Sequence, residues 1–235
     1  MDYIEKAITE YVKRSQDEYH DHSIYREYLG KMEKTPLAQL NEIHVVMIIK
    51  PFLYEWGKMG RVLGQKEFIG WEREIAEQVH SNLENLEKFK AMHLLNTNLT
   101  DFKKDIIKAY ESFKIIVERV AATKVLHIIC PNFFPLWDNA IKEVVKAELI
   151  RTISKGIEDF IEKDFDLLRE KIEDFSGEDY YIYMRMTQYF VERYKRTFYE
   201  LAKTYKKGVV KVLDDFLWMT AHRPLSLFFQ ESSTM

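Results

Sequence analysis

The sequence predicts an all-α fold, and three observations support this prediction. The chain has only 8 glycines and 5 prolines in 235 residues, about half their usual share. A β-rich protein of this length needs many turns, and the residues that form turns are scarce. Apolar residues make up 46% of the chain and recur at helical spacing. We therefore predict about eight to ten helices in an orthogonal or irregular bundle around a central helix.

Capping residues and prolines predict where the helices of the N-terminal half begin and end. Thr35 followed by Pro36 is a helix start, because a hydroxyl caps the first turn and proline fits its first position. Pro51 disfavours helix at the residue before it and should kink or restart the chain. The spacing predicts a helix from about Tyr3 that breaks before a second piece ending near Gly30. After Pro36, an apolar stripe follows at helical spacing, formed by Leu37, Leu40, Ile43 and Met47. A further helix is predicted over 66–90 with a break near Ser81, and another from about Thr100.

The C-terminal third is predicted to hold three helices of contrasting charge. Residues 156–175 carry an apolar stripe with acidic residues outside it. Ser176 and Asp179 resemble a capping box that opens the next helix, the longest, which extends to about residue 206. A last helix covers about residues 209–220 and ends before Pro224.

Several classes of protein are excluded by composition. The charged N-terminus is not a signal peptide. The longest uncharged run, residues 125–137, contains two prolines and is shorter than the ~20 residues of a membrane span. Cys130 is the single cysteine, so no internal disulfide forms. No linker rich in glycine, serine or proline is present, so we expect one cytoplasmic domain over 1–235, with a hinge near 154–156. The abundance of Lys and Glu is typical of thermophilic proteins.

The histidines do not form a recognisable metal site, because His20 and His22 point to different helix faces and the others are scattered. We expect neither a metal nor another cofactor. Gly57, Gly60 and Gly64 lie at spacings typical of a helix face that allows close approach of another helix. They lack the ending of a phosphate-binding loop. Trp56 and Arg61, next to these glycines, could still line a binding pocket.

A second candidate is a basic helix face. Net charge is −3, so no global field attracts nucleic acid. Within the predicted helix over 179–206, basic residues gather on one side, flanked by three tyrosines on which bases could stack; they are Arg185, Arg193, Arg196, Lys203 and Lys207, with Tyr181, Tyr189 and Tyr199. The alternative is a solvated face with the ion pairs Glu192–Arg196 and Glu200–Lys203, or a hairpin with the acidic helix over 156–175.

The segment over residues 120–145 is the most unusual part of the sequence. Lys124 and His127 lie on a predicted helix whose opposite faces are both apolar. A buried ammonium needs a polar partner or loses its proton. Asp138 follows two prolines and could return beside Lys124, and a desolvated lysine near a carboxylate is how an amine nucleophile is prepared. Alternatively, Asp138 caps the helix after it and Lys124 extends to solvent.

Residues 122–141, ATKVLHIICPNFFPLWDNAI, together with WGKMGR upstream and KVLDDFLW downstream, resemble an uncharacterised prokaryotic all-helical family with a Lys-x-Leu-His, Pro, Trp-Asp pattern. The segment is also similar to the helix-hairpin-helix DNA glycosylases, in which a helix lysine attacks the sugar carbon of a flipped nucleotide and an aspartate assists. That resemblance implies these roles for Lys124 and Asp138. The sequence departs from that family because residues 117–122 contain no glycine and the lysine-to-aspartate interval is shorter.

Two functions are therefore expected from different classes. The first is a nucleic-acid-processing enzyme of glycosylase/lyase type, with Lys124 as nucleophile, Asp138 as acid/base partner, and His127 and Trp137 lining the pocket. DNA or another nucleic acid would bind the Arg185–Lys207 face. The second is a non-enzymatic helical protein that binds a partner or forms a homodimer, in which the Lys124–Asp138 pair is structural. Neither function involves a membrane.

Overall fold

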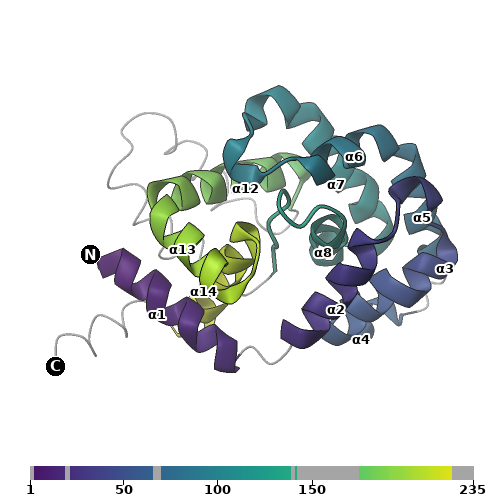
Figure 1. Cartoon of the computed structure of the whole chain (residues 1–235). Helices are drawn as coiled ribbons and strands as arrows, with labels where there is room; N and C mark the ends of the chain where they lie inside the picture. The colour runs from purple at the N-terminus through teal and green to yellow at the C-terminus, as the bar shows by residue number, and fades with distance from the viewer. Residues whose placement is uncertain (1–2, 19–21, 66–69, 139–140, 142–174, 224–235) are drawn as a thin grey trace. The chain divides into compact units, whose positions relative to one another are not determined.

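The computed structural model describes residues 3–18, 22–65, 70–138, 141 and 175–223, and every regular element in these ranges is a helix (Figure 1). The all-α prediction is confirmed. The chain divides into two compact units, one formed by residues 20–136 and the other by residues 1–19 and 137–235. The single-domain organisation stays a prediction, and the helix over 156–174 and the hinge near 154–156 lie outside the described residues. Among the helices described, none is both long and apolar enough to cross a membrane.

The unit formed by residues 20–136 is built around α8. Its elements are α2 (His22–Glu33), η1 (Leu37–Gln39), α3 (Glu42–His44), η2 (Val45–Ile49), η3 (Phe52–Trp56), α4 (Gly60–Leu63), α5 (Trp71–Ser81), α6 (Leu83–Ala91), η5 (Leu94–Asn96), η6 (Leu99–Phe102), α7 (Lys103–Val117) and α8 (Arg119–Ile129). α8 packs against α7, α2 and η3. Every residue from Val120 to Ile129 is buried, as predicted for a central helix with two apolar faces.

The helix predicted to start at Thr35 and Pro36 is wrong in its register. The Thr35 hydroxyl donates back to the preceding helix, and only the single turn of η1 follows Pro36. Asn41 then starts a new helix by accepting from a backbone amide of its first turn at 3.3 Å. The restart rotates the later part of the predicted stripe outward, so that Leu37 and Leu40 are buried whereas Ile43 and Met47 are 71% and 63% exposed.

The predicted restart of the chain at Pro51 is wrong, whereas the alternative of a kink stays a prediction. Lys50 has the helical angles φ −62° and ψ −50°, and the elements on either side of Pro51, η2 and η3, are π-helical. A π-turn has a wider hydrogen-bonded ring than an α-turn. It changes the hydrogen-bond register around a residue that has no amide hydrogen to donate. The helical path therefore continues from Glu42 to Trp56.

The remaining helices of this unit follow the predicted pattern closely. α5 and α6 meet at Asn82, one residue after the predicted break near Ser81. The helix predicted from about Thr100 begins as η6 and continues as α7. The apolar residues that recur at helical spacing in these helices are mostly buried, among them Ile75, Val79, Leu86, Ile106, Tyr110 and Phe113.

A single residue, Glu118, joins α7 to α8. Its angles, φ 71° and ψ 162°, belong to a region that glycine occupies freely and other residues rarely enter. Its side chain accepts from the Val120 amide at 3.4 Å, at the start of α8. The chain thus makes a tight turn between two helices without glycine.

The other unit contains α1 (Tyr3–Glu18), α12 (Gly177–Arg193), α13 (Lys195–Tyr205) and α14 (Val209–His222). α1, α13 and α14 pack side by side (Figure 1). The predicted capping box is confirmed, because the Ser176 hydroxyl accepts from the Asp179 amide at 3.3 Å while the Asp179 carboxylate accepts from the Ser176 amide at 2.8 Å.

The long helix predicted to reach residue 206 is wrong in its continuity. α12 ends at Arg193, Tyr194 leaves the helical region with φ −111° and ψ 28°, and α13 begins at the next residue. The Tyr194 ring packs on Phe190 at a centroid distance of 5.2 Å. The Phe198 ring, on the far side of the break, also packs on Phe190, at 5.8 Å. The break therefore allows both helices to bury aromatic rings in one cluster.

Candidate functional site

Lys124 is the buried lysine of α8. The residue is 8% exposed, and its Nζ donates to the Gly57 carbonyl oxygen at 2.7 Å. The same Nζ lies 6.0 Å from the centre of the Trp56 ring. The structure thus brings together two predicted site residues, Lys124 and Trp56, at the end of η3. A buried ammonium group requires polar contacts of this kind.

Gly57 must be glycine for a local reason. A Cβ atom at this position would lie 2.7 Å from the Leu53 carbonyl oxygen. At Gly64 a Cβ would lie 2.7 Å from the Gly60 carbonyl oxygen. The predicted role in helix–helix approach is wrong for Gly64, where a Cβ would meet only Gly60 within 4 Å; for Gly57 it stays a prediction beside this local reason. The Gly57 turn presents its carbonyl oxygen to Lys124.

Substituting Gly57→Ala is expected to destabilise the protein by roughly 1–3 kcal/mol, because the added methyl group overlaps a backbone carbonyl that cannot rotate away. Gly30→Ala is the matched control: Gly30 lies within α2, and a Cβ there meets nothing within 4 Å. That variant is expected to gain about 0.5–1 kcal/mol, because alanine is the better helix former. Urea denaturation measures both changes, and equal effects would contradict the steric explanation.

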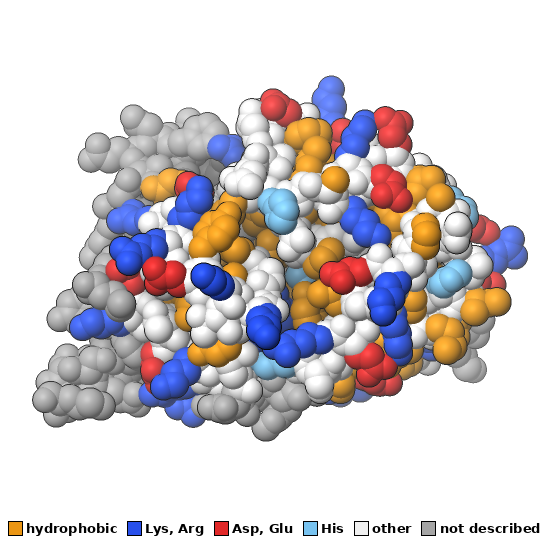
Figure 2. Space-filling view, in the orientation of Figure 1, with side chains coloured by type: hydrophobic (Ala, Val, Ile, Leu, Met, Phe, Trp, Pro, Cys, Tyr) orange, Lys and Arg blue, Asp and Glu red, His pale blue; other side chains and the backbone are white. Residues whose placement is uncertain are grey.

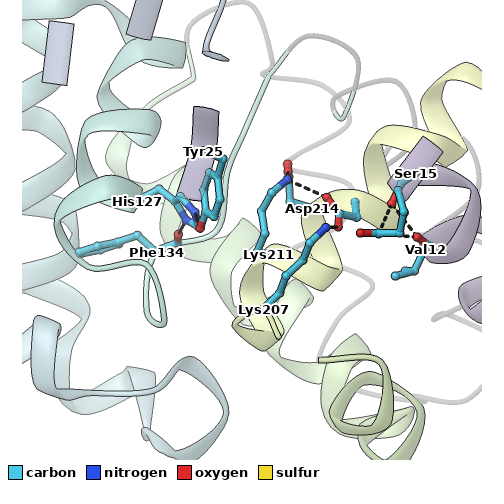
Figure 3. A network of polar contacts seen from close by, with 10 residues as sticks. Val12, Ser15, Tyr25, His127, Phe134, Lys207, Lys211 and Asp214 are labelled. Carbon is cyan, nitrogen blue, oxygen red and sulfur yellow. Dashed lines mark hydrogen bonds and ion pairs between the residues drawn. The ribbon is translucent and has the colours of Figure 1, made fainter. Parts of the chain in front are cut away.

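His127, one turn after Lys124, makes a hydrogen bond through each of its two ring nitrogens. Its Nδ1 lies 2.8 Å from the Phe134 carbonyl oxygen, and its Nε2 lies 2.9 Å from the Tyr25 hydroxyl (Figure 3). A carbonyl oxygen only accepts, so Nδ1 carries the hydrogen. In the neutral ring Nε2 is then the acceptor, and the Tyr25 hydroxyl donates to it. The structure thus adds Tyr25, which the sequence did not indicate, to the residues around α8.

Aromatic rings surround these polar groups. The Tyr25 ring lies 5.3 Å from the Trp56 ring and 6.2 Å from the Phe52 ring, measured between centroids. Phe52 and Trp56 are stacked at 4.8 Å. All three residues are buried. The Lys124 amine therefore lies in a low-dielectric setting, where electrostatic effects on its proton are strong.

Asp138 and Trp137 belong to the other compact unit, so the predicted pairing of Lys124 with Asp138 stays a prediction. The Asp138 carboxylate accepts from the Ile141 amide at 2.8 Å, which agrees with the alternative prediction that Asp138 is a helix cap. Trp137 is buried, stacks on Phe175 at 4.2 Å and meets the edge of Tyr183 at 4.8 Å. Within their unit, both residues therefore have structural roles.

A second cluster of buried charges lies at α14 and has no counterpart in the predicted site. Lys211 donates to the carboxylates of Asp214 and, at 2.7 Å, Asp215. Lys207, whose side chain is 2% exposed, donates to the second Asp215 oxygen at 2.6 Å (Figure 3). Two ammonium groups and two carboxylates thus compensate one another. The i, i+3, i+4 spacing of Lys211, Asp214 and Asp215 within an apolar helix is the sequence signal that could have identified it.

Burial and neighbouring charges shift the pKa values of groups in and beside this cluster. Burial lowers the pKa of Lys211, but Asp214 and Asp215 outweigh this effect and raise it above its ordinary value. Burial raises the pKa of Asp214; Lys211 opposes this increase, whereas Asp215 and, less strongly, Asp138 add to it. Burial, Asp214 and Asp138 together raise the pKa of Tyr183 well above its ordinary value. Lys211 therefore stays an ammonium ion at neutral pH, held between two carboxylates.

The predicted basic face is narrower than expected. Lys207 is directed inward to Asp215, and Tyr181 is buried. The observed ion pairs are Lys195–Glu192 and Arg196–Glu200, instead of the predicted Glu192–Arg196 and Glu200–Lys203. The break at Tyr194 separates Glu192 from Arg196, and Arg196 then pairs with Glu200 on α13. Arg185 on α12 is half-buried. On α13 the exposed residues at helical spacing are Arg196, Tyr199 and Lys203.

The surface drawn in Figure 2 carries basic and acidic side chains interspersed with hydrophobic ones. Arg61, a predicted pocket residue, is exposed on α4.

Within the described ranges, no group of three or more histidine, cysteine or carboxylate side chains could hold a metal ion. Burial raises the pKa of the Cys130 thiol, so this cysteine is not a reactive thiolate.

Comparison of the chain with known protein families, with curated proteins and with solved structures found no match.

Proposed function

We propose that this protein is a nucleic-acid-processing enzyme of the DNA glycosylase/lyase type, with the Lys124 amine as its nucleophile. The observation that carries the proposal is the hydrogen bond from this buried amine to the Gly57 carbonyl oxygen. A deprotonated amine still has N–H groups to donate, so it can lose its proton and keep this bond. A lysine acts as a nucleophile only as the neutral amine, so it must be able to lose its proton while it stays in position. Lys211 is a poorer candidate, because Asp214 and Asp215 raise its pKa above the ordinary value.

The proposed reaction takes place at the sugar of a damaged or abasic nucleotide. At an abasic site the neutral amine attacks the C1′ aldehyde carbon, and a C–N bond forms. The resulting carbinolamine loses water and becomes an imine. Asp138 is assigned the acid/base role in these proton transfers, and the Trp56 ring provides an aromatic face beside the amine, as base-flipping enzymes require.

Contact with the nucleic acid backbone is assigned to the outer face of α13. Arg196 and Lys203 would approach phosphates, and Tyr199, 42% exposed, offers a ring on which a base can stack. Because Arg196 is already paired with Glu200 at 2.9 Å, phosphate binding must exchange one anion for another. Because Arg196 and Lys203 would release counterions from the phosphates, binding is expected to weaken as salt rises.

Borohydride trapping tests the nucleophile directly. The protein is incubated with oligonucleotides that contain an abasic site or a damaged base, and sodium borohydride reduces any imine to a stable amine. A covalent adduct is expected with the wild-type protein and is expected to disappear in Lys124→Ala. Asp138→Asn is expected to slow adduct formation by about 10²-fold or more, the usual contribution of an acid/base group.

Lys88→Ala is the matched control, because Lys88 is an exposed lysine paired with Glu84. Its adduct should equal that of the wild-type protein. Circular dichroism verifies that each variant is folded. An adduct that persists in Lys124→Ala, or the absence of any adduct over a panel of lesions, contradicts the lysine mechanism.

A second candidate function is that of a non-enzymatic helical protein that binds a partner or forms a homodimer. The bond between Lys124 and Gly57 also supports this candidate, because it fastens α8 to the end of η3. The Asp138 cap at Ile141 is a structural role of the same kind. A folded wild-type protein that forms no adduct with any lesion, and is dimeric by sedimentation, would favour this second function.

A further inference from the structure

We propose that Tyr25 is a positioning residue for the Lys124 amine and acts through His127 and the Trp56 ring. Its catalytic meaning rests on the proposed function, whereas the positioning itself can be measured without a nucleic acid. Neither Tyr25 nor this connection follows from the sequence pattern, because Tyr25 lies 102 residues from His127.

The first step of the connection is the fixed tautomer of His127. Its Nδ1–H donates to the Phe134 carbonyl oxygen, so Nε2 of the neutral ring accepts from the Tyr25 hydroxyl. His127 is fully buried. A buried acceptor loses much free energy when its donor is removed. The Tyr25 hydroxyl is therefore held in one place by α8.

The second step is the contact between two rings. The Tyr25 ring packs against Trp56 at a centroid distance of 5.3 Å, and Trp56 faces the Lys124 amine at 6.0 Å. The next residue, Gly57, accepts from that amine. Two side chains one turn apart on α8 thus position two adjacent residues. Lys124 contacts Gly57 directly, and His127 contacts Tyr25, whose ring packs on Trp56.

This arrangement affects the proton of Lys124. An aromatic face near an ammonium group stabilises its charged form. If Trp56 is less firmly held, part of this stabilisation is lost, and the amine gives up its proton at a lower pH. Tyr25 thereby sets how much of Lys124 is the reactive, neutral amine at a given pH.

Reductive methylation of the intact protein tests the proposal. Formaldehyde condenses with a neutral amine, water leaves, and cyanoborohydride reduces the imine to a methylamine that mass spectrometry assigns to Lys124. Labelling is measured from pH 6 to pH 10 in the wild-type protein and in Tyr25→Phe. The variant is expected to reach half-labelling at a lower pH, with about threefold more labelling at any pH below the midpoint, which is part of the worth of a desolvated cation–π contact.

Tyr28→Phe is the control, because Tyr28 lies on the same helix, is also buried, and loses one hydrogen bond, to Glu55 at 3.1 Å. Its labelling midpoint should match that of the wild-type protein. General loosening would let water reach the Lys124 amine and would move the midpoint of both variants alike. Equal midpoints in Tyr25→Phe and Tyr28→Phe would overturn the proposal.

Trp56→Phe provides a second test if Tyr25→Phe does not fold. The substitution weakens the aromatic face beside Lys124 directly, so the labelling midpoint should move in the same direction. An unchanged midpoint in Trp56→Phe overturns the proposal. The outcome is separable from that of the proposed function. A shifted labelling midpoint without any nucleic acid adduct supports the positioning of Lys124 and rejects the glycosylase/lyase assignment.

Discussion

Asp215→Ala is expected to lower the free energy of unfolding by about 3–5 kcal/mol, the usual effect of removing one partner from a buried ionic network. The Asp215 carboxylate is fully buried and accepts from Lys207 at 2.6 Å and from Lys211 at 2.7 Å. Its removal leaves two buried ammonium groups with one carboxylate fewer. Urea denaturation monitored by circular dichroism measures the loss.

Glu200→Ala is the matched control for an ion pair at the surface. Glu200 pairs with Arg196 at 2.9 Å on α13, and both side chains are largely exposed. Its loss is expected to cost no more than about 0.5 kcal/mol. A variant in which Lys207, Lys211, Asp214 and Asp215 are all replaced by apolar residues should recover most of the stability that Asp215→Ala loses. Similar costs for Asp215→Ala and Glu200→Ala would show that the network does not depend on charge compensation.

Phe133→Ala is expected to destabilise the protein by about 3–5 kcal/mol, because it leaves a cavity in a close-packed aromatic cluster. Phe133 is fully buried, stacks on Phe89 at 4.7 Å and meets Phe134 edge-on at 4.9 Å. The backbone of Phe134 supports His127, so the substitution should also disturb the surroundings of Lys124. Thermal and urea denaturation measure the stability.

Phe102→Ala is the control within the same cluster. Phe102 is only half-buried and meets Phe89 at 6.2 Å. Its removal is expected to cost less than half as much as that of Phe133, since less apolar area returns to water. If Phe102→Ala proves as costly as Phe133→Ala, cavity formation does not explain the effect.

Local patterns predicted much of the secondary structure, and the errors have physical causes. The capping box at Ser176 and the break near Ser81 depend on neighbouring residues, and both were predictable. The continuity of the helix across Pro51 could not be predicted in this way, because π-turns adjust the hydrogen-bond register and residue propensities do not describe such turns. Local patterns do not predict the break at Tyr194, because it depends on where Phe190 and Phe198 pack in the tertiary structure.

Within the candidate site, the sequence by itself determined that α8 is buried and that Lys124 and His127 lie within it. Helical periodicity is sufficient for that conclusion, since it shows which faces of a helix are apolar. Only the tertiary structure decided that the Lys124 amine meets the carbonyl of Gly57, 67 residues away, and that His127 meets Tyr25. Hydrophobic burial is non-directional and can be satisfied by many covering segments. A hydrogen bond needs two particular atoms at a particular distance, and the packing of distant helices determines which atoms those are.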